Sequence, residues 1–150
     1  MLKGIDPLLS PALLKILCEM GHGDEIAVVD ANFTAESLGQ GKPIIRLPGC
    51  DLYRTCTAIL SVFPLDTAVT QPVAYMRVSD APAAYTSSVQ LSVIELLETS
   101  GSAASERCEA MDRFIFYERV KHAYAIVQTG EMQSYANFIF KKGVINWLSA

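Results

Sequence analysis

The sequence lacks several features that would assign it to a broad functional class. No apolar run approaches the roughly 20 residues of a membrane-spanning helix, and the start lacks the apolar segment of a signal peptide. Basic residues are few, because 12 Lys and Arg stand against 16 Asp and Glu. We therefore expect a cytoplasmic protein that binds neither a membrane nor nucleic acid, since nucleic-acid sites need a broad basic surface.

Cysteine and histidine are too scattered to predict a metal site. The four cysteines, Cys18, Cys50, Cys56 and Cys108, form no C-x-x-C pair, and no histidine spacing completes a zinc set. There is also no Gly-rich phosphate loop and no serine or cysteine nucleophile beside a base. We expect free thiols and no metal. A thiol-dependent enzyme is an alternative that predicts inactivation by cysteine alkylation.

What is present is a globular composition with alternating helix and strand patterns. The chain has 150 residues, of which 51% are hydrophobic, which suits one domain over residues 1–150. Periodicity and capping residues predict helices over residues 11–21, 52–62, 88–97 and 113–122, strands over 26–29, 44–47, 73–78, 106–111, 123–128 and 135–141, and a loop over 34–43. This order predicts an α/β fold, a single layered domain with a mixed, largely parallel sheet flanked by helices.

One histidine stands between two glycines just before a buried strand. His22 lies between Gly21 and Gly23, and Asp30 follows the apolar run 26–29. Ligands of open α/β sheets bind at the carboxyl ends of strands, where Asp30 would lie. His22 and Asp30 are therefore candidate site residues. The alternatives are a solvated histidine after a helix-capping Gly21 and an aspartate that serves only as a turn residue.

A second candidate group lies at the start of the helix predicted over residues 113–122. Arg113 and Tyr117 are four residues apart and share a helix face. A cation in the first helical turn is disfavoured by the helix dipole, which suggests that Arg113 holds ligand oxygens. The alternative is an ion pair with Asp112, the expected helix cap, or with Glu109.

The third group lies near the carboxyl end. Tyr135 and Asn137 would point to the same side of the last strand, and both side chains can donate and accept hydrogen bonds. The alternative is an ordinary polar outer face. Together, a histidine, an aspartate, an arginine, a tyrosine and an asparagine suit proton transfer on a small, uncharged, hydroxyl-rich ligand, and a sugar fits.

Several blocks of the sequence also match a known family. They include Gly21-His22-Gly23-Asp24-Glu25 and Tyr135-Ala136-Asn137. The matching blocks cover residues 1–5, 7–11, 19–26, 30–33, 113–114, 116–119, 129–131, 135–137 and 141–144. On these blocks the chain resembles the L-fucose mutarotase branch of the ribose pyranase/fucose mutarotase (RbsD/FucU) family, with a looser match over residues 39–105.

The resemblance implies an RbsD-like fold and a cofactor-free isomerase that interconverts the anomers of L-fucose or a related aldose. It implies a ring-shaped homo-oligomer, an octamer or a decamer, with active sites near subunit contacts. It also implies that His22 is the proton donor. The sugar-binding residues that it implies are Asp30, Arg113, Tyr117, Tyr135, Ala136 and Asn137.

The distance along the strand raises a geometric question. His22 precedes the strand and Asp30 follows it, and four extended steps span about 13 Å. Either a sugar bridges the two side chains, or they meet across a subunit contact. A protein of another class, a non-catalytic sugar-binding or transport-accessory protein, could have the same pocket. Anomer exchange distinguishes it from the enzyme.

Overall fold

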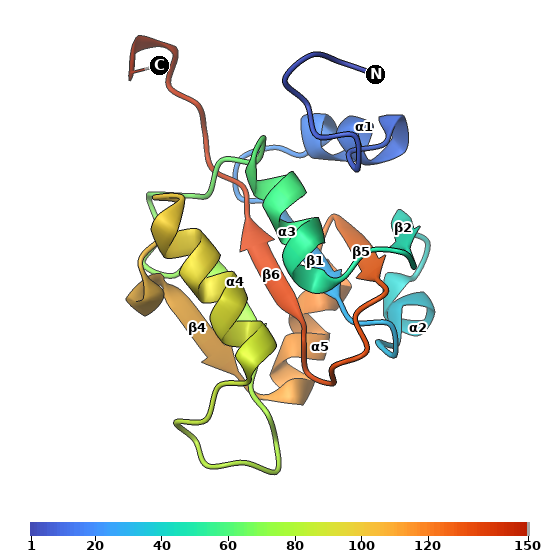
Figure 1. Cartoon of the computed structure of the whole chain (residues 1–150), viewed down its shortest axis with the longest axis vertical. Helices are drawn as coiled ribbons and strands as arrows, with labels where there is room; N and C mark the ends of the chain where they lie inside the picture. The colour runs from blue at the N-terminus through green and yellow to red at the C-terminus, as the bar shows by residue number, and fades with distance from the viewer. Residues whose placement is uncertain (150) are drawn as a thin grey trace.

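The fold, described for residues 1–149 of a computed structural model, is built around one six-stranded sheet (Figure 1). The strands are β1 (Glu25–Val29), β2 (Ile44–Leu47), β3 (Val73–Met76), β4 (Cys108–Met111), β5 (Ala125–Thr129) and β6 (Phe138–Lys141). Their order across the sheet is β2-β5-β1-β6-β3-β4. β1 pairs in parallel with β5, as does β2, and β3 pairs in parallel with β4. β6 runs antiparallel between β1 and β3, which confirms a mixed, largely parallel sheet.

Helices cover both faces of the sheet. They are α1 (Pro11–Glu19), α2 (Ala35–Gly39), α3 (Leu52–Leu60), α4 (Ser88–Thr99) and α5 (Arg113–His122). Apolar side chains of α1, α3 and α4 form one core with the sheet, and those of α2 and α5 form the other. The molecule therefore has three layers, with α3 and α4 in front of the sheet in Figure 1 and α5 behind it.

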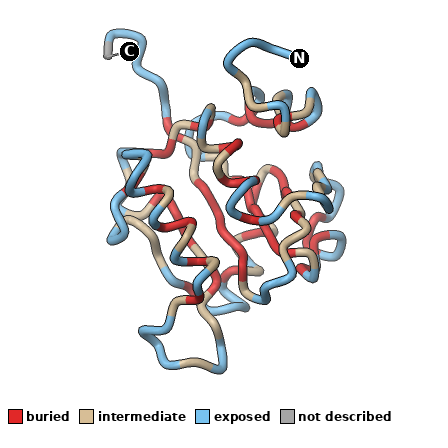
Figure 2. Tube along the Cα trace, viewed as in Figure 1, coloured by how far each residue is buried: buried red, intermediate tan, exposed pale blue. Residues whose placement is uncertain are grey.

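The apolar run of β1 shows why the sheet lies at the centre. Ile26 and Val28 enter the core under α1, α3 and α4, whereas Ala27 and Val29 enter the core under α2 and α5. All four are fully buried, because successive side chains of a strand point to opposite faces. In Figure 2 the strands at the centre are largely buried, and the helices around them mix buried, half-buried and exposed residues. An unbroken apolar strand is thus explained by burial on both faces.

Local sequence explains where most helices begin. The side chain of Ser10 accepts a hydrogen bond from the Leu13 amide, and Asp51 accepts one from Arg54. Ser87 and Gln90 form a complete capping box at the start of α4. Asp112 precedes α5 as predicted, but its side chain makes no cap bond there. It pairs with Arg77 instead.

Two predicted segments differ from the structure. The predicted loop over residues 34–43 contains the short helix α2. This helix ends before Gln40, whose backbone has the left-handed conformation. The predicted strand over residues 135–141 starts only at Phe138, because Tyr135 has φ 64° and cannot continue an extended chain. The alternation of side chains still holds from Ala136 onward, because Phe138 and Phe140 enter the α1–α3–α4 core and Ile139 the other.

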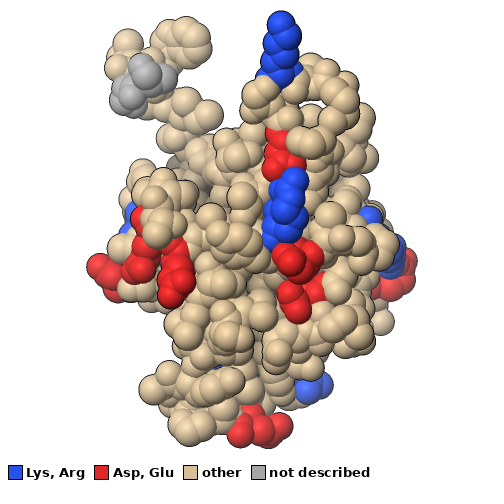
Figure 3. All heavy atoms as spheres, in the orientation of Figure 1, with Lys and Arg blue, Asp and Glu red and all other residues tan. Residues whose placement is uncertain are grey.

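The charged surface is broken into small groups. On the face shown in Figure 3, acidic and basic side chains are scattered and form no broad basic patch. The longest helix, α4, has 12 residues. None of the helices within residues 1–149 combines the length and the apolar character that a membrane span requires.

Candidate functional site

Five of the predicted site residues line one pocket. It has a volume of about 270 Å³, and its wall includes Asp30, Arg113, Tyr117, Tyr135 and Asn137. The pocket lies where β1 and β3 end and β6 begins, because β6 runs antiparallel to both. Its size is close to the lower end of small-molecule pockets, about 300 Å³. A ligand of monosaccharide size is therefore suitable.

Asp30 is the buried carboxylate of the pocket, with 4% of its surface exposed. Its backbone N–H donates to Asn137 Oδ1 at 2.8 Å, and its own Oδ1 accepts from the Asn32 amide at 3.0 Å. These bonds fix the end of β1 to the segment before β6. Burial raises the pKa of the Asp30 carboxyl above its usual value. A carboxyl held in this way is a strong acceptor for ligand hydroxyls.

Arg113 and Tyr117 form the wall that α5 contributes. The Arg113 guanidinium lies 5.5 Å from the centre of the Tyr117 ring and 5.1 Å from that of Phe114. Phe33 packs edge-on against Tyr117, with ring centres 5.5 Å apart. Within residues 1–149, Arg113 has no carboxylate partner, since Asp112 pairs with Arg77 and Glu109 lies near Arg119. Its donors remain available to a ligand.

The segment before β6 carries the remaining polar groups. Tyr135 and Asn137 both line the pocket, whereas the side chain of Ala136 between them is fully buried in the α1–α3–α4 core. Asn137 Nδ2 contacts only a weak acceptor, Met76 Sδ at 3.8 Å, among the described residues, so the amide keeps donor capacity. The left-handed backbone of Tyr135 costs on the order of 1 kcal/mol and needs support from its surroundings.

His22 lies at the opposite end of β1 from this pocket. It precedes β1 beside the end of β6, where the Gly23 amide donates to the Lys142 carbonyl at 2.8 Å. Gly23 has φ 86°, a conformation that favours glycine. The structure therefore brings five of the predicted residues together but does not bring His22 to them within one chain.

His22 has a partner that sequence reasoning missed. Its Nε2 lies 3.1 Å from Oδ2 of Asp66, and the Asp66 side chain is almost fully buried. A backbone hydrogen bond from Ala68 to the carboxylate, together with the contact to His22, lowers the pKa of Asp66, although burial acts in the opposite direction. An ionised carboxylate only accepts hydrogen bonds, so Nε2 donates and Nδ1 of His22 is free to exchange a proton.

The position of Asp66 is set by close backbone packing. A Cβ on Gly143 would lie 2.5 Å from the Leu65 carbonyl oxygen, so glycine is required where the chain leaves β6 beside Asp66. Arg107 donates to the carbonyl oxygens of Asp66 and Val69. No local pattern marks Asp66 in the sequence. The one available signal is its position two residues after Pro64, a proline that follows α3.

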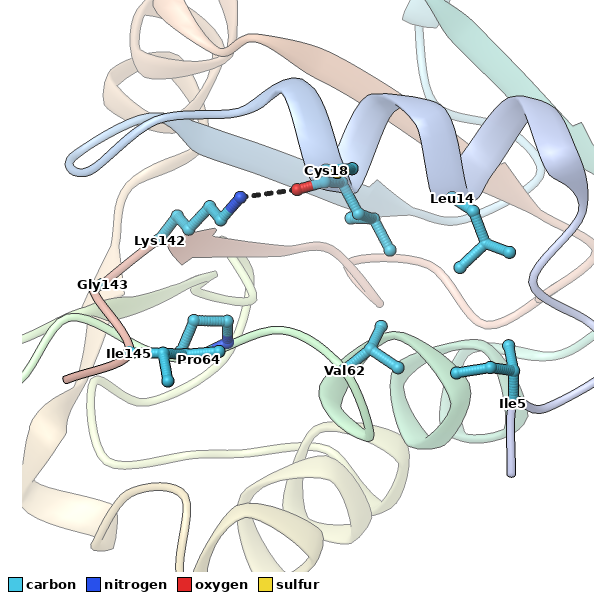
Figure 4. A pocket seen from close by; sticks show the side chains of 9 residues that line it. Ile5, Leu14, Cys18, Val62, Pro64, Lys142, Gly143 and Ile145 are labelled. Carbon is cyan, nitrogen blue, oxygen red and sulfur yellow. Dashed lines mark hydrogen bonds between the residues drawn. The ribbon is translucent and has the colours of Figure 1, made fainter. Parts of the chain in front are cut away.

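A second hollow, of about 390 Å³, lies between α1, the end of α3 and the segment after β6 (Figure 4). Its wall is mostly apolar, including Leu14, Val62 and Ile145. Lys142 reaches across to α1, where its ammonium group donates to the carbonyl oxygens of Leu17 and Met20. This hollow therefore lacks free polar groups suited to a sugar.

The described residues offer little for thiol chemistry, the alternative left by the sequence. All four cysteines are free thiols, as expected. Burial raises the pKa of Cys56 and that of Cys108, the latter to about 11, which leaves both thiols protonated. No group of three or more His, Cys, Asp or Glu side chains in the described part of the chain could hold a metal ion.

Comparison with known proteins decides the family. The model of the RbsD / FucU transport protein family matches residues 3–145. The chain belongs to this family. It is 42% identical over 144 residues to an L-fucose mutarotase of Histophilus somni, covering 96% of this chain and 97% of the relative. It is 43% identical over 148 residues to a fucose mutarotase of Mus musculus, covering 97% and 95%.

A solved structure matches the fold over nearly the whole chain. The fucose mutarotase of Streptococcus pneumoniae, solved in complex with L-fucose, has a TM-score of 0.88 and 39% sequence identity. The match covers 97% of this chain and all of that one. The RbsD-like fold implied by the sequence is therefore confirmed.

Proposed function

We propose that the chain is a cofactor-free isomerase that interconverts the α and β anomers of L-fucose or a related aldose. The observation that carries the proposal is the pocket in which Asp30, Arg113 and Tyr135 meet. Its donors and acceptors suit hydroxyl groups rather than a phosphate or a metal. The family membership and the L-fucose bound to a structural relative support a sugar as the ligand. We expect the protein to act in the cytoplasm as one domain over residues 1–150.

Mutarotation needs two proton movements around the anomeric carbon. When the ring opens, the bond between C1 and the ring oxygen breaks, the ring oxygen gains a proton and the anomeric hydroxyl loses one. A C=O group forms at C1, and the ring closes on either face after rotation about C1–C2. The protein supplies a proton donor and acceptors that hold the hydroxyls. Histidine suits the donor role near neutral pH.

In the proposed mechanism His22 acts in its imidazolium form and donates the proton from Nδ1, because its Nε2–H is bound to Asp66. Asp30 holds hydroxyls or accepts the anomeric proton. Arg113 and Tyr117 fix the pose from α5. Tyr135 and Asn137 do so from the segment before β6, to which Ala136 contributes only its backbone.

The opposite locations of His22 and the pocket support a shared site. Four residue steps along β1 span about 13 Å, and the side chains at its two ends face different surroundings. We propose that His22 of one subunit reaches the pocket of another within a ring-shaped homo-oligomer, an octamer or a decamer. Symmetric assemblies present the same pair of surfaces at every contact, so each subunit would both give and receive a histidine.

The test is anomer exchange followed by saturation-transfer NMR on L-fucose, ribose, galactose and other aldoses. We expect His22→Ala to slow exchange about 10²- to 10⁴-fold, which is the contribution of one positioned acid or base. Sugar binding should be retained. The matched control is His122→Ala, which removes the only other histidine, at the end of α5.

Two outcomes would contradict the proposal. Equal exchange by His22→Ala and the parent protein, with sugar bound to both, would exclude His22 as the proton donor. If the parent protein binds sugars but exchanges none of them, the non-catalytic sugar-binding function holds instead.

A further inference from the structure

We propose that Gln90 is a positioning residue for the sugar pocket. Its buried side-chain amide holds the backbone of Met76 and Tyr135 in the geometry that the sugar requires. The inference rests on the proposed function, since it concerns the same pocket. Gln90 lies on α4 and is not part of the pocket wall, so it would act through the residues it binds.

The Gln90 amide is fully used in joining three parts of the fold. Its Nε2 donates to the Met76 carbonyl oxygen at 2.7 Å and to the Tyr135 carbonyl oxygen at 2.9 Å. Its Oε1 accepts from the Ser87 amide at 3.0 Å. Gln90 is completely buried, so none of these bonds competes with water. The end of β3, the start of α4 and the segment before β6 are thus tied to one side chain.

Both carbonyl groups belong to residues that line the pocket. Tyr135 has φ 64°, which an L-residue adopts only when its surroundings impose it. Its carbonyl oxygen also accepts from the Asn137 amide at 2.9 Å. Asn137 in turn holds the backbone N–H of Asp30. The bond from Gln90 therefore begins a chain of contacts that ends at the buried carboxylate of the site.

Capping a helix does not by itself require glutamine. A capping box needs an acceptor at this position, and glutamate supplies one as well. Only the amide also has an N–H₂ group that can donate to two carbonyl oxygens. Glutamine at residue 90 thus performs two tasks, of which the donation concerns the pocket. The two tasks can be separated by substitution.

The test compares Gln90→Met with Ser87→Ala in the full-length protein. Gln90→Met removes the two donated bonds and also the bond that Oε1 accepts from the Ser87 amide, and it leaves both carbonyl oxygens buried without a donor. Ser87→Ala removes the other half of the capping box, which is the bond from the backbone N–H of Gln90 to Ser87 Oγ. It leaves in place the two bonds that the Gln90 side chain donates to the carbonyl oxygens of Met76 and Tyr135. Melting temperatures show how far each substitution destabilises the fold.

We expect hydrogen exchange of the Asn137 amide to rise about tenfold in Gln90→Met, as for the loss of one hydrogen bond, and to stay unchanged in Ser87→Ala. In Gln90→Met we expect kcat/KM for anomer exchange to fall by up to about 10²-fold, mainly through KM, because the pocket loses its geometry. If Gln90→Met fails to fold, Gln90→Glu is measured instead, because it keeps the cap acceptor and the chain length and replaces the N–H₂ group by an oxygen.

The amide-exchange measurement does not depend on catalysis. If the parent protein exchanges no anomers while Gln90→Met still speeds exchange of the Asn137 amide, the proposed function fails and the positioning of this segment stands. If Gln90→Met changes neither amide exchange nor KM, or if Ser87→Ala changes both to the same extent, Gln90 has only a structural role and the inference is overturned.

Discussion

At the scale of single residues, the buried surroundings of Asp30 disfavour the ionised form of its carboxyl group. Burial raises the pKa of its carboxyl, so the folded chain favours the ionised form less than the unfolded chain does. The resulting loss of stability is present above the raised pKa. It disappears as the pH falls below the ordinary range of aspartate, where both states are protonated.

We therefore expect Asp30→Asn to raise the melting temperature at neutral pH, with a gain that shrinks as the pH falls through the raised pKa. The amide oxygen can still accept from Asn32. Affinity for the sugar should fall roughly 10- to 100-fold, as for the loss of a hydrogen bond to a charged group. Thermal melts at several pH values and a sugar titration measure the two effects. Asp80→Asn, at an exposed aspartate, is the control and should change neither. A lower melting temperature for Asp30→Asn at neutral pH would contradict the argument.

Three of the pocket residues could be predicted one by one, because each lies at the end or the start of a predicted element. Asp30 ends an apolar strand, and Arg113 and Tyr117 begin a helix. Asp66 could not be predicted, because its partner His22 is 44 positions away. The two meet through the antiparallel bridge between Leu65 and Lys142. Contacts of that kind depend on strand pairing, which a single sequence does not display.

At the scale of elements, one half-buried charge cluster joins α5 to the sheet. Arg119 of α5 donates to both carboxylate oxygens of Glu25 at the start of β1, and Lys141 of β6 lies 3.3 Å from the same carboxylate. Burial alone would raise the pKa of Glu25, but the bonds from Arg119 hold it below its usual value. Stability from this group is present above the unfolded pKa and is lost as the pH falls through the folded pKa.

Glu25→Gln should destabilise the protein at neutral pH by about 2 kcal/mol, because hydrogen bonds to a charged group in a largely buried pair are lost. The difference from the parent should narrow in acid, since protonation removes the same bonds there. Urea unfolding at two pH values measures it. Glu118→Gln, which breaks the exposed pair with Lys121, should cost less than about 1 kcal/mol. Equal losses in the free energy of unfolding for both substitutions would show that the Glu25 cluster stabilises the fold no more than an exposed ion pair does.

Element prediction failed where tertiary contacts decide the structure. The helix α2 has five residues and no side-chain cap, which is too short for a stable isolated helix. It forms because Ala35 and Leu38 are buried against the sheet and α5. The longer helices and the buried strands were predicted because their patterns are local. The start of β6 was missed because nothing in the sequence marks the left-handed Tyr135.

At the scale of the whole molecule, the separation of His22 from the pocket can be tested by mixing subunits. His22→Ala and Asp30→Asn chains are each expected to be poorly active. After joint refolding at equal amounts, random assembly should restore up to about a quarter of the parent activity. Each shared site takes its histidine from one subunit and its pocket from another, and each of these two parts is intact in about half of the cases.

The control is a mixture of the two proteins assembled separately, which should show no recovery. If joint refolding gives no more activity than this control, His22 and the pocket do not cooperate between subunits. The proposal of a shared site would then be wrong.

The central position of β6 has a consequence for biosynthesis. Five parallel strands are complete once Thr129 has left the ribosome, but they form two separate pieces, β2-β5-β1 and β3-β4. Only the final strand bridges them, and the residues immediately before it, Tyr135 and Asn137, line the pocket. A chain that leaves the ribosome in sequence order therefore acquires its ligand site only when β6 joins the two pieces into one sheet.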